Sequence, residues 1–149
     1  MPATERAREL ALTAAQAAAD KKAEDIVILD VADQLAITDA FVLASAPNER
    51  QVMAIVDAIE ERLAQLPEKA KPVRREGERG GRWVLLDYVD IVVHVQHSEE
   101  RVFYALERLW KDCPELKLPA DAAATRGKGA EHAKLKASED AAELGGELR

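Results

Sequence analysis

Two short apolar runs, separated by a four-residue connector, place the strongest constraint on the fold. Residues 83–86 and 91–95 are rich in β-branched and aromatic side chains, which favour strands. The connector, residues 87–90, allows only a tight reversal, so the two runs predict an antiparallel hairpin. Because an isolated hairpin is marginally stable in water, further elements must cover it.

Three helices are predicted to provide that cover. Residues 4–22 are rich in good helix formers, and Thr4 is placed to cap them. Asn48 begins the next helix, with Gln51 three residues later as in a capping box. Its apolar stripe consists of Val52, Ile55, Val56, Ile59, Leu63 and Leu66. Ser98 is expected to cap the last helix, whose apolar face consists of Val102, Phe103, Leu106, Leu109 and Trp110.

Additional strands complete a sheet. The apolar runs at residues 26–29 and 40–44 predict two strands, and residues 71–76 suit an edge strand. This order of elements predicts an α/β fold, a mixed sheet of about five strands with packed helices, over residues 1–118. Residues 119–149 are polar and Ala-rich, which predicts a flexible C-terminal tail.

Composition narrows the function. The 149-residue chain has a net charge of −7, which disfavours general binding to nucleic-acid backbones and favours a basic protein partner. The single cysteine, Cys113, excludes an intramolecular disulfide and a multi-cysteine metal site. Neither a secretion signal nor a membrane-spanning run is recognised, so we expect a cytoplasmic protein without a membrane partner.

The basic residues are unevenly distributed along the chain. Lys and Arg are absent between Lys22 and Arg50, and again between Arg82 and Arg101, while both stretches contain several carboxylates. Turns favour Asp and helix starts favour Glu, which is a purely local explanation. Alternatively, the two stretches converge at one end or face of the sheet and form an acidic interface.

Four blocks of the chain carry a recognisable pattern, at residues 37–45, 48–52, 83–97 and 101–110. These blocks resemble the RsfS/Iojap family of ribosomal silencing factors, and the last two are the most specific. The resemblance covers roughly the first 115 residues, which is most of the predicted domain. Two loops depart from it. In the first loop, residues 46–48 replace a Gly-Thr-Ser-like run. In the hairpin turn, Val89 occupies a position where Gly is frequent in the family. Because Val disfavours a positive φ, the turn is expected to differ in type.

The resemblance implies a nucleotidyltransferase-like fold without catalytic residues, and a protein that is not an enzyme and has no cofactor. It implies binding to the large ribosomal subunit, chiefly to ribosomal protein L-fourteen, on the surface where the small subunit docks. Occupying that surface blocks subunit joining and represses translation under nutrient limitation. The family is also linked to large-subunit assembly. Both a monomer and a weak homodimer remain open.

We predict seven partner-binding residues around the hairpin. They are Asp39, Trp83, Leu85, Asp87, Tyr88, Asp90 and His94. Strand alternation places Trp83, Leu85 and Asp87 on one face of the sheet, which presents apolar side chains if helices leave it uncovered. Trp83 is the preferred anchor, with a core position as the alternative. Tyr88 is expected to be exposed in the turn, whereas Trp110 is expected in the core.

His94 in a strand is more often structural than catalytic. His97 lies three residues on and therefore points to the opposite face, so the pair is not expected to hold a metal ion. A nucleotidyltransferase-like enzyme is the alternative function. Such an enzyme needs two or three carboxylates on one side of a strand to hold magnesium. The pairs Asp30/Asp33 and Asp87/Asp90 are spaced three residues apart, which places the two carboxylates of each pair on opposite faces of a strand. A local cluster of basic residues could also contact ribosomal RNA at the rim of the interface. Its members are Arg74, Arg75, Arg79 and Arg82.

Overall fold

The protein is described by a computed structural model that covers residues 2–77, 81–104 and 106–127. Its elements follow one another as α1 (Glu5–Asp20), β1 (Glu24–Asp30), β2 (Ala40–Ala46), α2 (Glu49–Ala64), β3 (Arg74–Gly77), β4 (Trp83–Asp87), β5 (Ile91–His97), α3 (Ser98–Tyr104), α4 (Leu106–Leu109) and α5 (Ala120–Ala123). The predicted α/β fold with a five-stranded sheet is confirmed. No helix within these residues has the length and apolar character needed to span a membrane.

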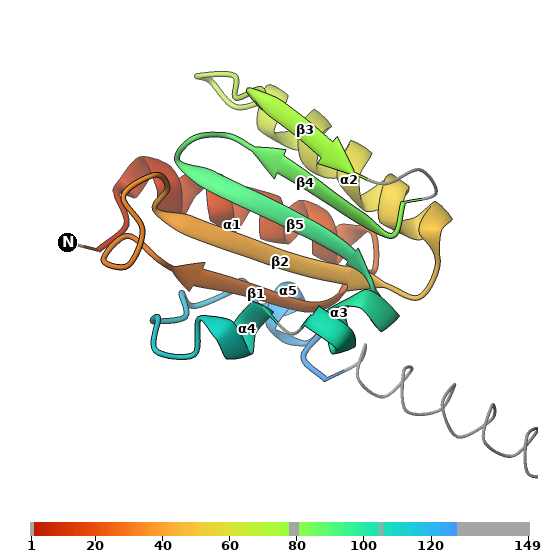
Figure 1. Cartoon of the computed structure of the whole chain (residues 1–149). Helices are drawn as coiled ribbons and strands as arrows, with labels where there is room; N and C mark the ends of the chain where they lie inside the picture. Colours follow the sequence, from red (N-terminus) through yellow and green to blue (C-terminus); the bar gives the residue numbers. More distant parts are fainter. Residues whose placement is uncertain (1, 78–80, 105, 128–149) are drawn as a thin grey trace, which may run out of the picture.

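The sheet is mixed, with the strand order β1-β2-β5-β4-β3 (Figure 1). The central pair β2 and β5 is parallel, and the other neighbours are antiparallel. β4 and β5 form the predicted hairpin, in which Leu85 lies opposite His94. β3 is the predicted edge strand. All four of its residues are exposed, which a short, charged strand tolerates at an edge.

Helices α1 and α2 cover one face of the sheet (Figure 1). The predicted caps of both helices are confirmed. The Thr4 hydroxyl accepts the Ala7 N–H at 3.1 Å, and the Asn48 side chain accepts the Gln51 N–H at 2.8 Å. The Gln51 side chain does not complete a capping box, because it donates instead to the carbonyls of Lys21 and Lys22. Five residues of the predicted α2 stripe are fully buried, and the sixth, Leu66, is partly buried.

The segment after α4 runs along the outer edge of β1. The Asp30 N–H donates to the Pro114 carbonyl at 2.7 Å, and the Leu116 N–H donates to the Ile28 carbonyl at 2.9 Å. Further on, the Thr125 carbonyl accepts the Asp25 N–H at 2.9 Å, and α5 packs against α1 and β1. The packed chain therefore extends to residue 127, which differs from the flexible tail predicted from residue 119. Residues 128–149 of that predicted tail lie outside the described part.

The turn between β4 and β5 keeps an unusual backbone conformation. Val89 has φ of 71°, and the Asp90 N–H donates to the Tyr88 carbonyl at 2.9 Å, which closes a γ-turn around Val89. The Asp87 carboxylate accepts the Val89 N–H at 2.8 Å and so braces the turn. The turn therefore adopts a positive φ even with a β-branched residue in place of glycine, a combination that stores backbone strain.

Candidate protein-interaction face

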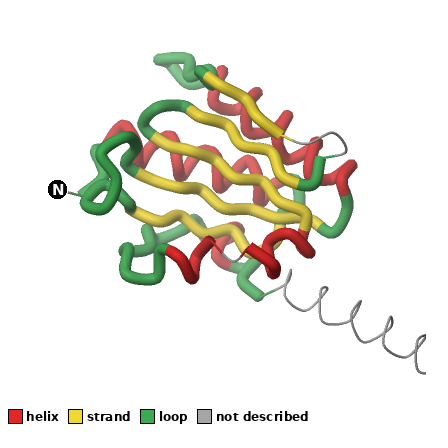
Figure 2. Tube along the Cα trace, viewed as in Figure 1, coloured by secondary structure: helices red, strands yellow, loops and turns green. Residues whose placement is uncertain are grey.

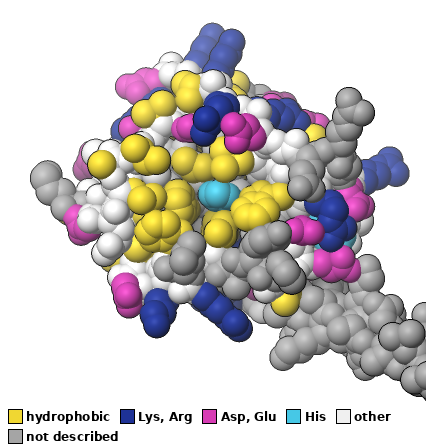
Figure 3. Space-filling view, in the orientation of Figure 1, with side chains coloured by type: hydrophobic (Ala, Val, Ile, Leu, Met, Phe, Trp, Pro, Cys, Tyr) yellow, Lys and Arg dark blue, Asp and Glu magenta, His cyan; other side chains and the backbone are white. Residues whose placement is uncertain are grey.

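The second face of the sheet is left largely uncovered by helices and faces the viewer in Figures 1 and 2. Strand alternation along β4 follows the prediction: Val84 and Leu86 are buried on the helix side, whereas Trp83, Leu85 and Asp87 are only partly buried on the second face. Figure 3 shows apolar side chains around a histidine on this face. We call the following residues the open-face patch: Phe41, Trp83, Leu85, Val92, His94 and Trp110.

Aromatic rings connect the members of the open-face patch. The Trp83 indole N–H donates to His94 Nδ1 at 3.3 Å. The ring of Phe41 meets the His94 ring edge-on, with centroids 5.2 Å apart, and meets the Trp110 ring edge-on at 5.6 Å. These contacts bring together side chains from β2, β4, β5 and the residue just after α4. They also restrict the rotamers of Trp83.

His94 organises the patch in its neutral form. Burial lowers the pKa of His94 from 6.5 to about 4, and the charge of Arg101 acts in the same direction. Because Nδ1 accepts the indole proton of Trp83, the imidazole proton of the neutral ring lies on Nε2. The ring is buried beneath its neighbours. Its role is therefore to position Trp83 and Phe41, in agreement with the structural role expected of a strand histidine.

Asp39, Asp87 and Asp90 gather at one end of the sheet. The Asp39 N–H donates to the Asp90 carbonyl at 3.0 Å, which joins the loop before β2 to the hairpin turn. The Asp39 carboxylate accepts the Thr4 N–H at 3.0 Å. One Asp87 oxygen braces the turn, and the other lies 4.0 Å from Arg74. These carboxylates thus have local structural contacts as well as a shared location.

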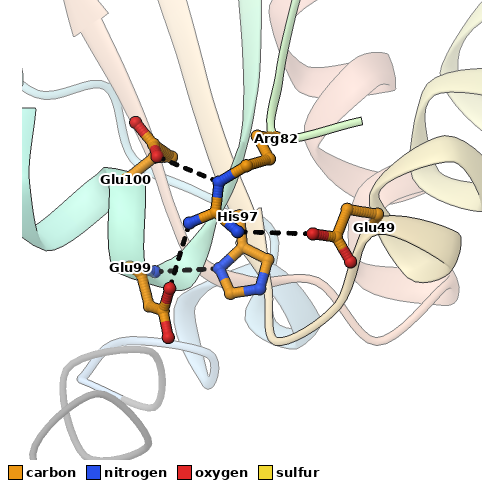
Figure 4. Close-up of polar contacts among 5 residues, drawn as sticks. All are labelled: Glu49, Arg82, His97, Glu99 and Glu100. Atoms are coloured by element: carbon orange, nitrogen blue, oxygen red, sulfur yellow. Dashed lines mark hydrogen bonds and ion pairs between the residues drawn. The ribbon is translucent and has the colours of Figure 1, made fainter. Parts of the chain in front are cut away.

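Three further acidic residues of these stretches, Glu49, Glu99 and Glu100, lie at the opposite end of the sheet and surround Arg82 (Figure 4). Its guanidinium contacts Glu99 and Glu100 at 3.0 Å each and Glu49 at 3.3 Å. The His97 ring accepts the Glu99 N–H at 3.1 Å and caps the start of α3, a position that was expected for the Ser98 side chain. The two acidic stretches of the sequence therefore divide between both ends of the sheet and do not form one acidic surface.

The described members of the predicted basic rim do not all lie together. Arg74 and Arg75 belong to β3 and pair with Glu76 and Glu60, with the closest atoms 3.3 Å and 3.2 Å apart. Arg82 precedes β4, which runs antiparallel to β3, so it lies at the other end of the sheet. Arg79 lies outside the described residues. These partly neutralised side chains offer little attraction for a phosphate backbone.

Tyr88 corrects the prediction of an exposed aromatic residue in the turn. The alternation of β4 continues one residue past the end of the strand, so Tyr88 follows Leu86 into the core on the helix side. It is 5% exposed, and burial raises the pKa of its hydroxyl. Tyr88 is therefore not accessible to a partner. Trp110, expected in the core, is only partly buried and packs beside Leu29, Leu43 and Cys113.

Sequence reasoning did not assign Phe41, Val92 or Trp110 to the site. The alternation of β2 and β5 carries a usable signal, because Phe41 and Val92 are partners in the parallel pair and their side chains share a face. The sequence lacked the strand order that makes them neighbours. In the described part of the chain, no three His, Cys, Asp or Glu side chains are grouped to hold a metal ion.

Comparison with known proteins agrees with this architecture. The family model described as "Ribosomal silencing factor during starvation" matches residues 4–143. The ribosomal silencing factor RsfS of Halalkalibacterium halodurans is 41% identical over 112 residues, which are 74% of this chain and 93% of that protein. A crystal structure of a Chromobacterium violaceum protein superposes with a TM-score of 0.65 at 32% identity, covering 70% of this chain and 85% of the other.

A more distant relative is a mouse protein named for its part in mitochondrial assembly of the large ribosomal subunit. It is 31% identical over 91 residues, which are 60% of this chain and 40% of the mouse protein. The resemblance noted in the sequence thus holds over the whole folded unit. The chain belongs to the family of ribosomal silencing factors.

Proposed function

We propose that this protein binds the large ribosomal subunit through the open-face patch, and that its chief partner there is ribosomal protein L-fourteen. The bound protein occupies the surface on which the small subunit docks and so blocks subunit joining. Translation is thereby repressed when nutrients are limiting. The same binding mode accounts for a link to large-subunit assembly. The protein acts in the cytoplasm as a binding protein rather than as an enzyme.

The observation that carries this proposal is the partly exposed Trp83, held by His94 at the edge of an apolar patch on an uncovered sheet face. Tryptophan in such a setting is the residue type most enriched among interface hot spots. Contiguous apolar surface on one face of a folded chain is typical of a partner site. Asp87, on the same face, adds a carboxylate that suits a basic ribosomal protein.

Titration of purified bacterial large ribosomal subunits tests the proposal. We expect Trp83→Ala to weaken binding by roughly 100-fold, which is typical of a hot-spot aromatic residue. The double variant Asp87→Lys/Asp90→Lys should also bind more weakly, since it reverses the charge beside the patch. The matched control is Asp57→Lys/Glu61→Lys, which reverses two exposed carboxylates on α2, on the covered side of the sheet.

Subunit joining is measured in the same preparation by light scattering of mixed subunits. The wild type should reduce joining in proportion to the occupied large subunits, and Trp83→Ala should not. If the wild type does not bind large subunits, the proposed function is wrong. If it binds without affecting joining, the steric block is wrong while the partner assignment stands. A chain that binds equally well to subunits lacking L-fourteen would show that another component is the partner.

A further inference from the structure

Exposed aliphatic side chains gather at the end of the sheet that carries the hairpin turn. Ile37, Val73 and Val89 are 80%, 68% and 54% exposed. They belong to the loops before β2, before β3 and between β4 and β5, which lie from the left to the top of the molecule in Figure 2. Among the described residues, five large apolar side chains are exposed, and three of the five lie at this end. We call these three residues the loop ridge.

Backbone hydrogen bonds fix the three loops beside one another. The Asp39 N–H donates to the Asp90 carbonyl at 3.0 Å, and the Val73 N–H donates to the Asp87 carbonyl at 2.7 Å. The loops therefore follow the order of the strands from β2 through β5 and β4 to β3. With strands spaced about 4.8 Å apart, the loop ridge extends over roughly 14 Å. The three exposed side chains thus belong to neighbouring loops that backbone hydrogen bonds join at one end of the sheet.

Val89 adopts a backbone conformation that is unfavourable for valine. Its φ of 71° lies in a region that β-branched residues avoid, yet the γ-turn and the Asp87 brace keep it there. Strained residues of this kind concentrate at binding and switch sites. A solvent-facing valine in a strained turn contributes little to the core. The combination indicates that its side chain serves a contact outside the molecule.

The charges in these loops select the kind of partner. Asp39, Asp87 and Asp90 lie beside Ile37 and Val89, where they repel a phosphate backbone and attract a basic protein surface. The loop of Val73 carries Glu68 together with the basic residues Lys69 and Lys71. Asp87 also connects the loop ridge to the open-face patch. Its side chain shares the uncovered face with Trp83 and Leu85, and its carbonyl holds the loop of Val73.

We propose that the loop ridge is a second contact region of this protein, which docks against a basic and partly apolar protein surface of the large ribosomal subunit adjoining the one bound by the open-face patch. The inference rests on the proposed function. It extends the proposed contact surface from the open face of the sheet to the loops at its end. Docking through two adjoining surfaces fixes the orientation of the bound protein, which a single flat patch does not. The loop ridge thus determines which part of the subunit surface the bound protein covers.

The test uses the full chain with single substitutions Ile37→Ser, Val73→Ser and Val89→Ser, titrated onto purified bacterial large subunits. Burying the exposed part of each side chain predicts a loss of affinity of roughly 10-fold for Ile37→Ser and roughly 5-fold for each valine variant. Val102→Ser is the matched control, because Val102 is 53% exposed but lies on α3, at the opposite end of the sheet. Melting temperatures measured alongside confirm that each variant is folded at the assay temperature.

Losses at the three ridge positions, with an unchanged affinity for Val102→Ser, support the inference. If Trp83→Ala abolishes binding while the ridge variants bind as the wild type does, the inference is wrong and the proposed function stands. If the wild type does not bind at all, both are wrong. Protein-free ribosomal RNA is titrated as a second probe. Binding to it that weakens in the ridge variants by the same factors would assign the surface to RNA and overturn the inference.

Discussion

The strained turn at Val89 allows a sharp test of the backbone geometry through glycine and alanine substitutions. Val89 has φ of 71°, whereas Val73, another exposed valine in a loop, is not among the described residues with a positive φ. Both substitutions remove an exposed aliphatic side chain, so the burial lost is similar within each pair. The difference between Gly and Ala at one position therefore reports the backbone conformation at that position.

The expected magnitudes follow from two opposing effects. A residue with a Cβ atom held in a sparsely populated region of φ and ψ costs about 1–3 kcal/mol, which glycine avoids. Glycine loses more entropy on folding, which favours alanine by about 0.5–1 kcal/mol at an ordinary position. We therefore expect Val89→Gly to exceed Val89→Ala in unfolding free energy by about 1 kcal/mol. At residue 73 the order should reverse, with Val73→Ala ahead of Val73→Gly by about 0.5–1 kcal/mol.

The assay is urea unfolding of the four variants, followed by circular dichroism, with thermal unfolding as a second measurement. For a chain of this size, 1 kcal/mol corresponds to a difference of about 2–4 °C in the melting temperature. If alanine is the more stable substitution at both positions, Val89 does not occupy the strained conformation. Val89 would then give no support to a strained turn or to a contact at the loop ridge.

Three further predictions concern other parts of the molecule. Because the pKa of His94 is lowered to about 4 in the folded state, the unfolded state binds more protons as the pH falls from 6.5 to 4. The wild type should lose about 3 kcal/mol of unfolding free energy over that range, and His94→Asn, titrated in urea at the same pH values, should not show this loss. Arg82→Met removes three ion pairs, so it should lower the urea concentration at the midpoint of unfolding. The difference from the wild type should be smaller at high salt, because salt screens the ion pairs. Binding to large subunits should be unchanged. A chain ending at residue 118 should unfold with about 2–3 kcal/mol less free energy than one ending at residue 127, because it lacks the hydrogen bonds of Thr125 and Gly127 to β1. Light scattering should also show that the shorter chain aggregates more readily, and equal behaviour of the two chains would contradict the packed role of α5.

Local patterns in the sequence predicted the elements well. The hairpin, the α2 stripe and the caps at Thr4 and Asn48 each depend on residues within a few positions of one another, so their signals are complete in the sequence. Alternation along β4 also identified Trp83, Leu85 and Asp87 as neighbours on one face. These predictions required no knowledge of which strands are adjacent.

The predictions that differed from the structure depended on contacts between distant segments. Tyr88 is buried because α1 and α2 cover its side of the sheet, a fact that the turn sequence does not contain. The acidic stretches separate because Glu49, Glu99 and Glu100 converge on Arg82, which required the positions of α2, β4 and α3. The packing of residues 119–127 rests mainly on backbone hydrogen bonds and buried Ala122, neither of which produces a hydrophobic pattern.

The parallel pairing of β2 with β5 determines when the sheet can assemble during synthesis of the chain. β5 is the central strand, and it joins β1 and β2 to β4 and β3, although it is the last strand to be synthesised. The two halves of the sheet therefore cannot unite until β5 has left the ribosome. The rings of Phe41 and Trp83 both contact His94 on that strand. The open-face patch of a nascent chain thus assembles only after β5 has emerged, when most of the chain has been translated.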